Sequence, residues 1–144
     1  MAKKKIAIVV SDFNDEITRR MEKKARDAAK ENDVEVVKVV HVPGAYDMPI
    51  IVSELAGRDD VEGVVALGAI IKGETKHDEI ISIACAKMLS EISVKHGKPV
   101  GFGVIGPGVS YDKARARAEI YAKRAVEAVV KLIDAKNECR KQEG

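Results

Sequence analysis

Thr75 and His77 are the residues whose types and spacing suggest chemistry most directly. They follow residues 64–71, an apolar run that predicts a buried strand, and they precede a long helical pattern. Histidine can both give and take a proton near neutral pH. The Thr75 hydroxyl and the N–H groups at the start of the next helix suit an anion. The segment therefore predicts a phosphate-bearing substrate and proton transfer, although a histidine near a helix start can also be structural.

Two other loops carry residues that stand out by type. Phe13 is one of two phenylalanines and lies in a polar loop. It can anchor that loop on the sheet or stack against a planar heterocycle. Asp47 lies in the proline-containing loop at residues 42–49, where it can accept hydrogen bonds from hydroxyl groups or cap the helix after Met48. The sequence thus offers an aromatic ring and a carboxylate to accompany His77.

Basic side chains gather on the last predicted helix, at Arg115, Arg117, Lys123 and Arg124. Such residues usually form a solvated face, but one or two can reach a phosphate, including a phosphate bound across a subunit boundary. Arg117 suits that role through its planar fork of donors. The three histidines, His41, His77 and His96, are widely separated and have no metal-ligand spacing, so we expect no metal site.

These loops need a scaffold that brings them together. Hydrophobic patterning predicts strands at residues 6–10, 34–42, 61–71 and 100–105, and helices at residues 16–30, 50–56, 78–95 and 111–136. We expect the second strand near a sheet edge, a break of the fourth strand at residues 106–108, and fraying of the last eight residues. Alternating strands and helices predict a parallel sheet covered by helices on both faces. The loops after its strands then share one edge, where open α/β sheets bind ligands.

The composition narrows the class of protein. The chain of 144 residues predicts a single domain, 1–144, and its 46% hydrophobic content suffices for a core. A net charge of +2 does not favour nucleic acid or an anionic membrane as a partner. No stretch is apolar enough to span a membrane and no signal peptide is apparent, so we expect a cytoplasmic protein. Cys85 lies in an apolar helical pattern and is expected in the core.

The motifs, taken in order, resemble those of the lumazine synthase family. The matching segments are Phe13 with Asn14, residues 42–49, residues 67–77 and residues 99–104, with a weaker match in the basic helix between Arg117 and Ala128. The resemblance covers essentially the whole chain and is strongest to archaeal members. It implies a flavodoxin-like fold: a three-layer α/β/α sandwich around a four-stranded parallel sheet.

The resemblance also implies a reaction. Members of the family condense 5-amino-6-(D-ribitylamino)uracil with 3,4-dihydroxy-2-butanone 4-phosphate to 6,7-dimethyl-8-ribityllumazine, phosphate and water, in riboflavin biosynthesis. The implied partners are these two small molecules, one of them phosphorylated, and the implied chemistry needs no cofactor and no metal. Two alternatives are an archaeal-type riboflavin synthase and a shell protein whose role is assembly. The pattern from Gly73 to His77 favours the synthase that makes lumazine.

Residue roles follow from the same resemblance. His77 is the implied catalytic residue, which moves protons. The implied substrate-binding residues are Phe13, Asn14, Ala45, Tyr46, Asp47, Ile70, Ile71, Lys72, Glu74, Thr75, Phe102 and Arg117. Among these, Phe13 stacks on the pyrimidine and Asp47 holds the ribityl hydroxyls. The backbone near Ile70, Ile71 and Lys72 reads the pyrimidine edge. Gly73, Glu74 and Thr75 shape the phosphate end.

The family further implies a homo-oligomer with active sites at subunit interfaces, either a pentamer or a 60-subunit shell of pentamers. Phe102 and Arg117 then come from the neighbouring subunit, with Arg117 on the phosphate. The sequence departs from the family in three places. Asp47 replaces a more usual Glu, residues 106–108 replace a Thr-rich turn, and the last helix is one residue shorter. The shortening leaves open whether Lys123 or Arg124 is the second phosphate-contacting cation.

Overall fold

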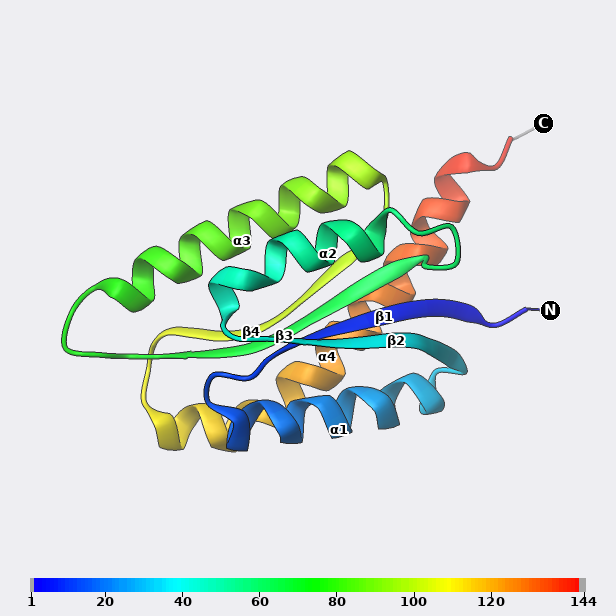
Figure 1. Cartoon of the computed structure of the whole chain (residues 1–144). Helices are drawn as coiled ribbons and strands as arrows, with labels where there is room; N and C mark the ends of the chain where they lie inside the picture. The colour runs from blue at the N-terminus through cyan, green and yellow to red at the C-terminus, as the bar shows by residue number, and fades with distance from the viewer. Residues whose placement is uncertain (1, 143–144) are drawn as a thin grey trace.

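Four parallel strands form one sheet between two layers of helices (Figure 1). The computed structural model describes residues 2–142. The elements are β1 (Lys4–Ser11), α1 (Asp15–Glu31), β2 (Val34–Val42), the 3-10 turn η1 (Ala45–Asp47), α2 (Met48–Ala56), β3 (Gly63–Ile71), α3 (His77–His96), β4 (Val100–Val109) and α4 (Tyr111–Arg140). The order and type of the predicted elements are confirmed, and the fold is the expected flavodoxin-like α/β/α sandwich.

The strand order in the sheet is β2-β1-β3-β4. Strand β2 is therefore at an edge, as predicted. In Figure 1, α1 and α4 cover one face of the sheet, and α2 and α3 cover the other. The chain thus reverses its direction across the sheet between β1 and β3. This reversal places the carboxyl ends of β1 and β3 side by side, with their connections leaving toward opposite faces.

The two central strands are buried on both faces because their sequences are continuous apolar runs. In β1, alternate side chains enter different cores. Ile6 and Ile8 pack with α1 and α4, whereas Ala7 and Val9 pack with α2 and α3. A strand packed from both sides has little freedom to shift, so its carboxyl end is a rigid base for a loop.

Strand β4 continues to Val109, four residues beyond its predicted end at residue 105. Gly106 and Gly108 adopt positive φ angles of 114° and 72°, which glycine tolerates. They form an irregular segment, after which the strand resumes its pairing with β3, and the Lys72 N–H donates to the Val109 carbonyl at 2.9 Å. The predicted break was therefore wrong: these glycines bend the strand without ending it.

Helix α4 also differs from its predicted length. It continues to Arg140, four residues beyond the expected end at residue 136. The added residues 137–140 are exposed and include Glu138 and Arg140, which favour helices even without packing contacts. Residues 143 and 144 of the expected frayed tail lie outside the described residues. No helix in the described part of the chain is long and apolar enough to cross a membrane.

Helix α4 approaches β4 closely at Gly101. A Cβ atom there would lie 2.7 Å from both the Ala125 carbonyl oxygen and a Val129 methyl group. We predict that Gly101→Ala lowers the free energy of unfolding by about 1–3 kcal/mol, because the helix must move away from the sheet. Chemical denaturation measures the change. Gly73→Ala is the matched control, since nothing lies within 4 Å of its added Cβ. Equal denaturation midpoints for the two variants would contradict the prediction.

Candidate functional site

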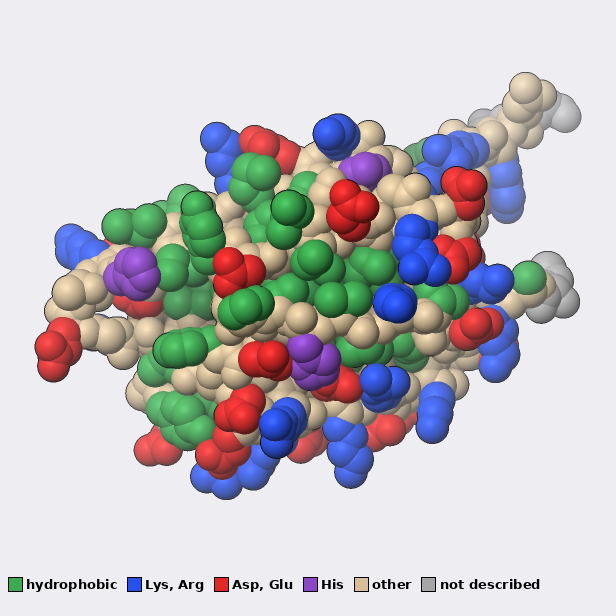
Figure 2. All heavy atoms as spheres, viewed as in Figure 1, with side chains coloured by type: hydrophobic (Ala, Val, Ile, Leu, Met, Phe, Trp, Pro, Cys, Tyr) green, Lys and Arg blue, Asp and Glu red, His purple; other side chains and the backbone are tan. Residues whose placement is uncertain are grey.

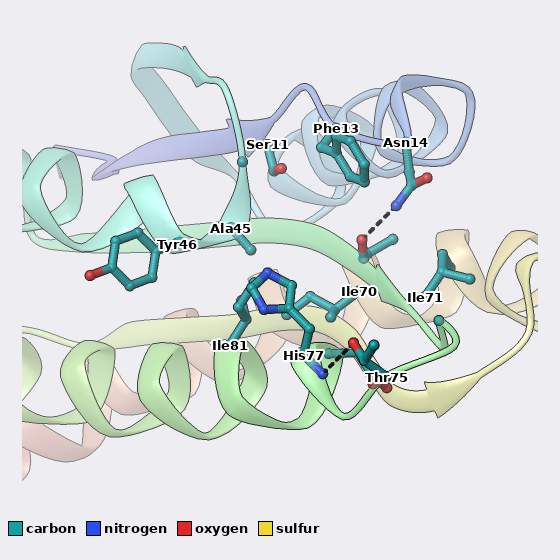
Figure 3. A pocket seen from close by; sticks show the side chains of 14 residues that line it. Ser11, Phe13, Asn14, Ala45, Tyr46, Ile70, Ile71, Thr75, His77 and Ile81 are labelled. Atoms are coloured by element: carbon teal, nitrogen blue, oxygen red, sulfur yellow. Dashed lines mark hydrogen bonds between the residues drawn. The ribbon is translucent and has the colours of Figure 1, made fainter.

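A cavity of about 430 Å³ lies at the carboxyl ends of β1 and β3 (Figure 3). Its walls come from the loops after β1, β2 and β3 and from the first turns of α3. The lining residues are Ser11, Phe13, Asn14, Gly44, Ala45, Tyr46, Ala69, Ile70, Ile71, Gly73, Thr75, His77, Asp78 and Ile81. Its size suits a small organic ligand. The expected convergence of three loops on one edge of the sheet is confirmed.

The loop after β1 is held by backbone and side-chain bonds. The Asp12 and Phe13 N–H groups donate to the Val42 and Pro43 carbonyls at 2.8 and 3.0 Å. These bonds join the loop to the one after β2. The Phe13 side chain stays 70% exposed, so its ring is available to a ligand at the mouth of the cavity.

Asn14 joins the loop to the neighbouring strand. Its φ of 64° lies in the left-handed region, which Asn tolerates better than most residues. Its side-chain amide donates to the Ala69 carbonyl at 2.9 Å and does not cap α1. The backbone carbonyl of Asn14, by contrast, accepts from the Ile17 and Thr18 N–H groups at the start of α1.

The turn after β2 rests on Cys85. Ala45 is buried, and its carbonyl accepts a weak hydrogen bond from the Cys85 thiol at 3.7 Å. Burial raises the pKa of Cys85 to about 11, so the thiol stays protonated near neutral pH. The prediction that Cys85 is a core residue is confirmed. Tyr46, next to Ala45, is 71% exposed and borders the cavity.

The loop after β3 brings Thr75 and His77 to the cavity wall opposite Phe13 (Figure 3). The Thr75 Oγ1 accepts a hydrogen bond from the His77 backbone N–H at 3.3 Å. This N–H of the helix start is thus already used within the protein. The His77 side chain is exposed at the first residue of α3. It can exchange protons with a bound molecule without first breaking the helix.

Asp78 also lines the cavity, and the sequence reasoning missed it. The residue is 7% exposed, and its Oδ2 accepts the Gly108 N–H at 3.1 Å. It therefore ties the start of α3 to the irregular end of β4. Helical spacing could have found it, since the buried face of α3 comprises Asp78, Ser82, Cys85, Leu89 and Ile92.

Five of the expected site residues do not line this cavity: Asp47, Lys72, Glu74, Phe102 and Arg117. Lys72 and Glu74 are exposed in the same loop as Thr75. Asp47 borders a neighbouring groove between α2 and α3, and its side chain makes no capping hydrogen bond to α2. Phe102 and Arg117 are exposed on β4 and α4. Among the residues that the structure describes, eight of the thirteen expected site residues therefore line the cavity.

The geometry defines a class of protein. It is an α/β protein with a ligand-sized cavity at the point where the strand order reverses, the position at which doubly wound sheets bind ligands. The cavity lining includes the aromatic ring of Phe13, the hydroxyl group of Thr75 and the imidazole of His77. The chain belongs to the 6,7-dimethyl-8-ribityllumazine synthase family, whose model matches residues 3–137.

Several archaeal proteins that are similar to this chain are named 6,7-dimethyl-8-ribityllumazine synthase. The 6,7-dimethyl-8-ribityllumazine synthase of Sulfolobus acidocaldarius is 53% identical over 128 residues, which are 89% of this chain and 81% of the relative. That of Aeropyrum pernix is 52% identical over 129 residues, with 89% and 88% covered. That of Pyrobaculum arsenaticum is 48% identical over 136 residues, with 94% and 91% covered. The similarity therefore extends over 89–94% of this chain and 81–91% of these relatives.

Two substitutions of Asn14 separate the contribution of its side-chain hydrogen bond from that of its left-handed backbone conformation. We predict that Asn14→Gly lowers the free energy of unfolding by about 1 kcal/mol, because only the hydrogen bond to Ala69 is lost. Asn14→Ala should cost roughly 2–3 kcal/mol, because an alanine Cβ also strains the left-handed backbone. Chemical denaturation of both variants measures the difference. Equal losses would show that the backbone conformation at residue 14 carries no cost.

Proposed function

We propose that the chain catalyses the condensation of 5-amino-6-(D-ribitylamino)uracil with 3,4-dihydroxy-2-butanone 4-phosphate to 6,7-dimethyl-8-ribityllumazine, releasing phosphate and water. Membership of the synthase family supports this activity. The single structural observation that supports it most is the cavity at the ends of β1 and β3, with Phe13 on one wall and His77 and Thr75 on the other. The alternative of a riboflavin synthase is not favoured, because the similar proteins named above are all synthases of lumazine.

The proposed roles combine the residues that line the cavity with the roles that the family resemblance implies. The exposed Phe13 ring stacks on the pyrimidine, and the strand-end backbone at Ile70 and Ile71 reads its polar edge. Asn14, Ala45 and Tyr46 complete this wall, with Asp47 near the ribityl chain. Thr75 and the exposed loop residues Lys72 and Glu74 lie at the phosphate end. His77, the first residue of α3, sits at the same end of the cavity as Thr75.

The reaction needs several proton transfers. An amine adds to a ketone and water leaves, phosphate is eliminated, and a second amine–carbonyl addition closes the ring with loss of a second water. Each step gains from a positioned acid or base, and His77 is the histidine that lines the cavity. Holding the two substrates together supplies a further part of the acceleration. Every step is an addition, elimination or proton transfer, so the proposed reaction uses no redox cofactor.

We also propose that the active site is completed by a second copy of the chain, within a pentamer or a larger shell of pentamers. Phe102 and Arg117 are exposed and lie outside the cavity of their own chain. A neighbouring subunit that supplied them would add a second ring and a fixed positive charge for the departing phosphate. Apolar side chains also gather over α2 and α3 (Figure 2). They include Ile50, Ile80 and Ile83, each at least 66% exposed, and such patches favour association.

The activity is tested by mixing the purified protein with both substrates and following lumazine fluorescence. Product formation above the spontaneous rate is expected. Incubation with lumazine alone is the matched control, since riboflavin formed from it would indicate the alternative enzyme. A protein that assembles but forms no lumazine would be a shell protein, and the proposed synthase activity would be wrong.

His77 provides a sharper test of the mechanism. We predict that His77→Ala lowers kcat by about 10²- to 10⁴-fold, because proton transfer loses its positioned group. Light scattering should give the same assembly mass as the wild type, because the side chain is exposed. His96→Ala is the control, since His96 hydrogen-bonds Ser53 away from the cavity. Disassembly of the His77 variant would assign the histidine a structural role instead.

The shared site can be tested by complementation. We predict that His77→Ala and Arg117→Ala subunits are each weakly active alone. If they are dissociated, mixed in equal amounts and reassembled, about a quarter of the interfaces pair an intact His77 with an intact Arg117 across a heterologous contact. Activity should then rise toward about a quarter of the wild-type value. No gain after mixing, with mixed assembly shown by mass spectrometry, would contradict a site shared between subunits.

A further inference from the structure

His41, near the end of β2, has carboxylates on both ring nitrogens. Its Nδ1 lies 2.6 Å from Asp12 Oδ1, and its Nε2 lies 2.7 Å from Glu22 Oε1. Neutral imidazole has one N–H group, so it can donate to only one of two acceptors. An imidazolium can donate to both. The arrangement therefore matches the charged form of His41.

The charges around His41 come from two elements packed against it. Asp12 belongs to the loop after β1, and Glu22 belongs to α1, where its second oxygen accepts from Arg26 Nε at 3.1 Å. The residues flanking His41 on β2, Val40 and Val42, are uncharged. The hydrogen bond with Asp12 raises the pKa of His41 most, partial burial opposes this, and the negative charge of Glu22 raises the pKa further.

The contacts of His41 with Asp12 and Glu22 lie close to the point where the loop after β1 is joined to the loop after β2. Asp12 precedes Phe13, and His41 precedes Val42 and Pro43, whose carbonyls accept the Asp12 and Phe13 N–H groups. The Phe13 ring itself is largely exposed. Its direction therefore depends on the loop backbone, and His41 holds that backbone through Asp12, although neither residue lines the cavity.

We propose that His41 is a positioning residue that, as an imidazolium bridging Asp12 and Glu22, holds the loop carrying Phe13 in the conformation that binds the pyrimidine. This inference rests on the proposed function for the identity of the ligand. Loss of the proton leaves a ring lone pair facing one carboxylate, so one of the two contacts is lost and the loop loosens. Loss of the proton should therefore weaken binding of the substrate that stacks on Phe13 and leave binding of the phosphate-bearing substrate nearly unchanged.

The direction of the pH dependence follows from the raised pKa. The contacts of His41 are fully present below the ordinary histidine pKa of about 6.5. They are lost as the pH rises through the higher pKa of the folded protein. KM for 5-amino-6-(D-ribitylamino)uracil should therefore increase toward alkaline pH, by roughly two- to fivefold for an exposed charge pair. KM for 3,4-dihydroxy-2-butanone 4-phosphate should change less over the same range.

Two substitutions separate charge from shape. His41→Gln is neutral at every pH. Its KM for the pyrimidine should therefore be higher than that of the wild type at low pH, and should not increase further toward alkaline pH. His41→Arg is always charged and presents several donors, so it should keep a low KM up to alkaline pH. His96→Gln is the control histidine variant and should keep the wild-type profile. Equal profiles for the wild type and His41→Gln would overturn the proposal, as would a His41→Arg variant that behaves like His41→Gln.

A second measurement does not depend on the reaction. Hydrogen exchange of the Phe13 amide in the free protein, compared at one alkaline pH, should be faster in His41→Gln than in His41→Arg. If the wild type makes no lumazine, the proposed function fails, but this comparison still tests whether His41 holds the loop. Unchanged exchange in His41→Gln would overturn the inference. Faster exchange with an unchanged pyrimidine KM would also overturn it, because the loop would then move without affecting binding.

Discussion

The reversal of strand order between β1 and β3 is the constraint on which the site depends. Strand β1 leads to α1 on one face of the sheet, and β3 leads to α3 on the other face. The two connections diverge, so no helix closes the space above the strand ends. The cavity is therefore a consequence of topology. The apolar runs of β1 and β3 matter for function because they place these two strands at the centre of the sheet and bury them on both faces.

The rim of the cavity is held by long-range hydrogen bonds, while the side chains proposed to act on the substrates stay exposed. Asn14 bonds the Ala69 carbonyl, the Phe13 N–H bonds the Pro43 carbonyl, and Asp78 bonds the Gly108 N–H. By contrast, the side chains of Phe13 and His77 are exposed. A rigid rim with exposed working residues fits a site that closes only when substrates and a neighbouring subunit arrive, which is why the proposed activity and the proposed assembly depend on each other.

Much of the fold was predictable from the sequence because its signals are local. Apolar runs predicted the strands, and apolar residues at helical spacing, such as Ile17 and Met21, form the buried face of α1. The end of β4 was mispredicted because residues 106–108 contain two glycines and a proline, which locally read as a break. What continues the strand is pairing with β3 and Lys72, which no local pattern reveals.

The site was predictable in part for the same reason. Thr75 and His77 stood out because they follow a buried strand, and Phe13 because it is an aromatic residue in a polar loop. The structural roles of Asn14 and Asp78 were not predictable in this way. Their partners lie 55 and 30 residues away in the sequence, so their hydrogen bonds exist only once the sheet has formed. The carboxylate partners of His41 were not predictable for the same reason, because Asp12 and Glu22 lie far from His41 in the sequence.

The proposal that the cavity at the ends of β1 and β3 binds the pyrimidine substrate is tested most directly by a crystal structure of the protein with a non-reactive ribityl-substituted pyrimidine. We predict that the ring lies in the cavity between β1 and β3, against the side chain of Phe13 and within reach of a neighbouring subunit's Phe102. A pyrimidine bound elsewhere, for example in the groove between α2 and α3, would contradict it.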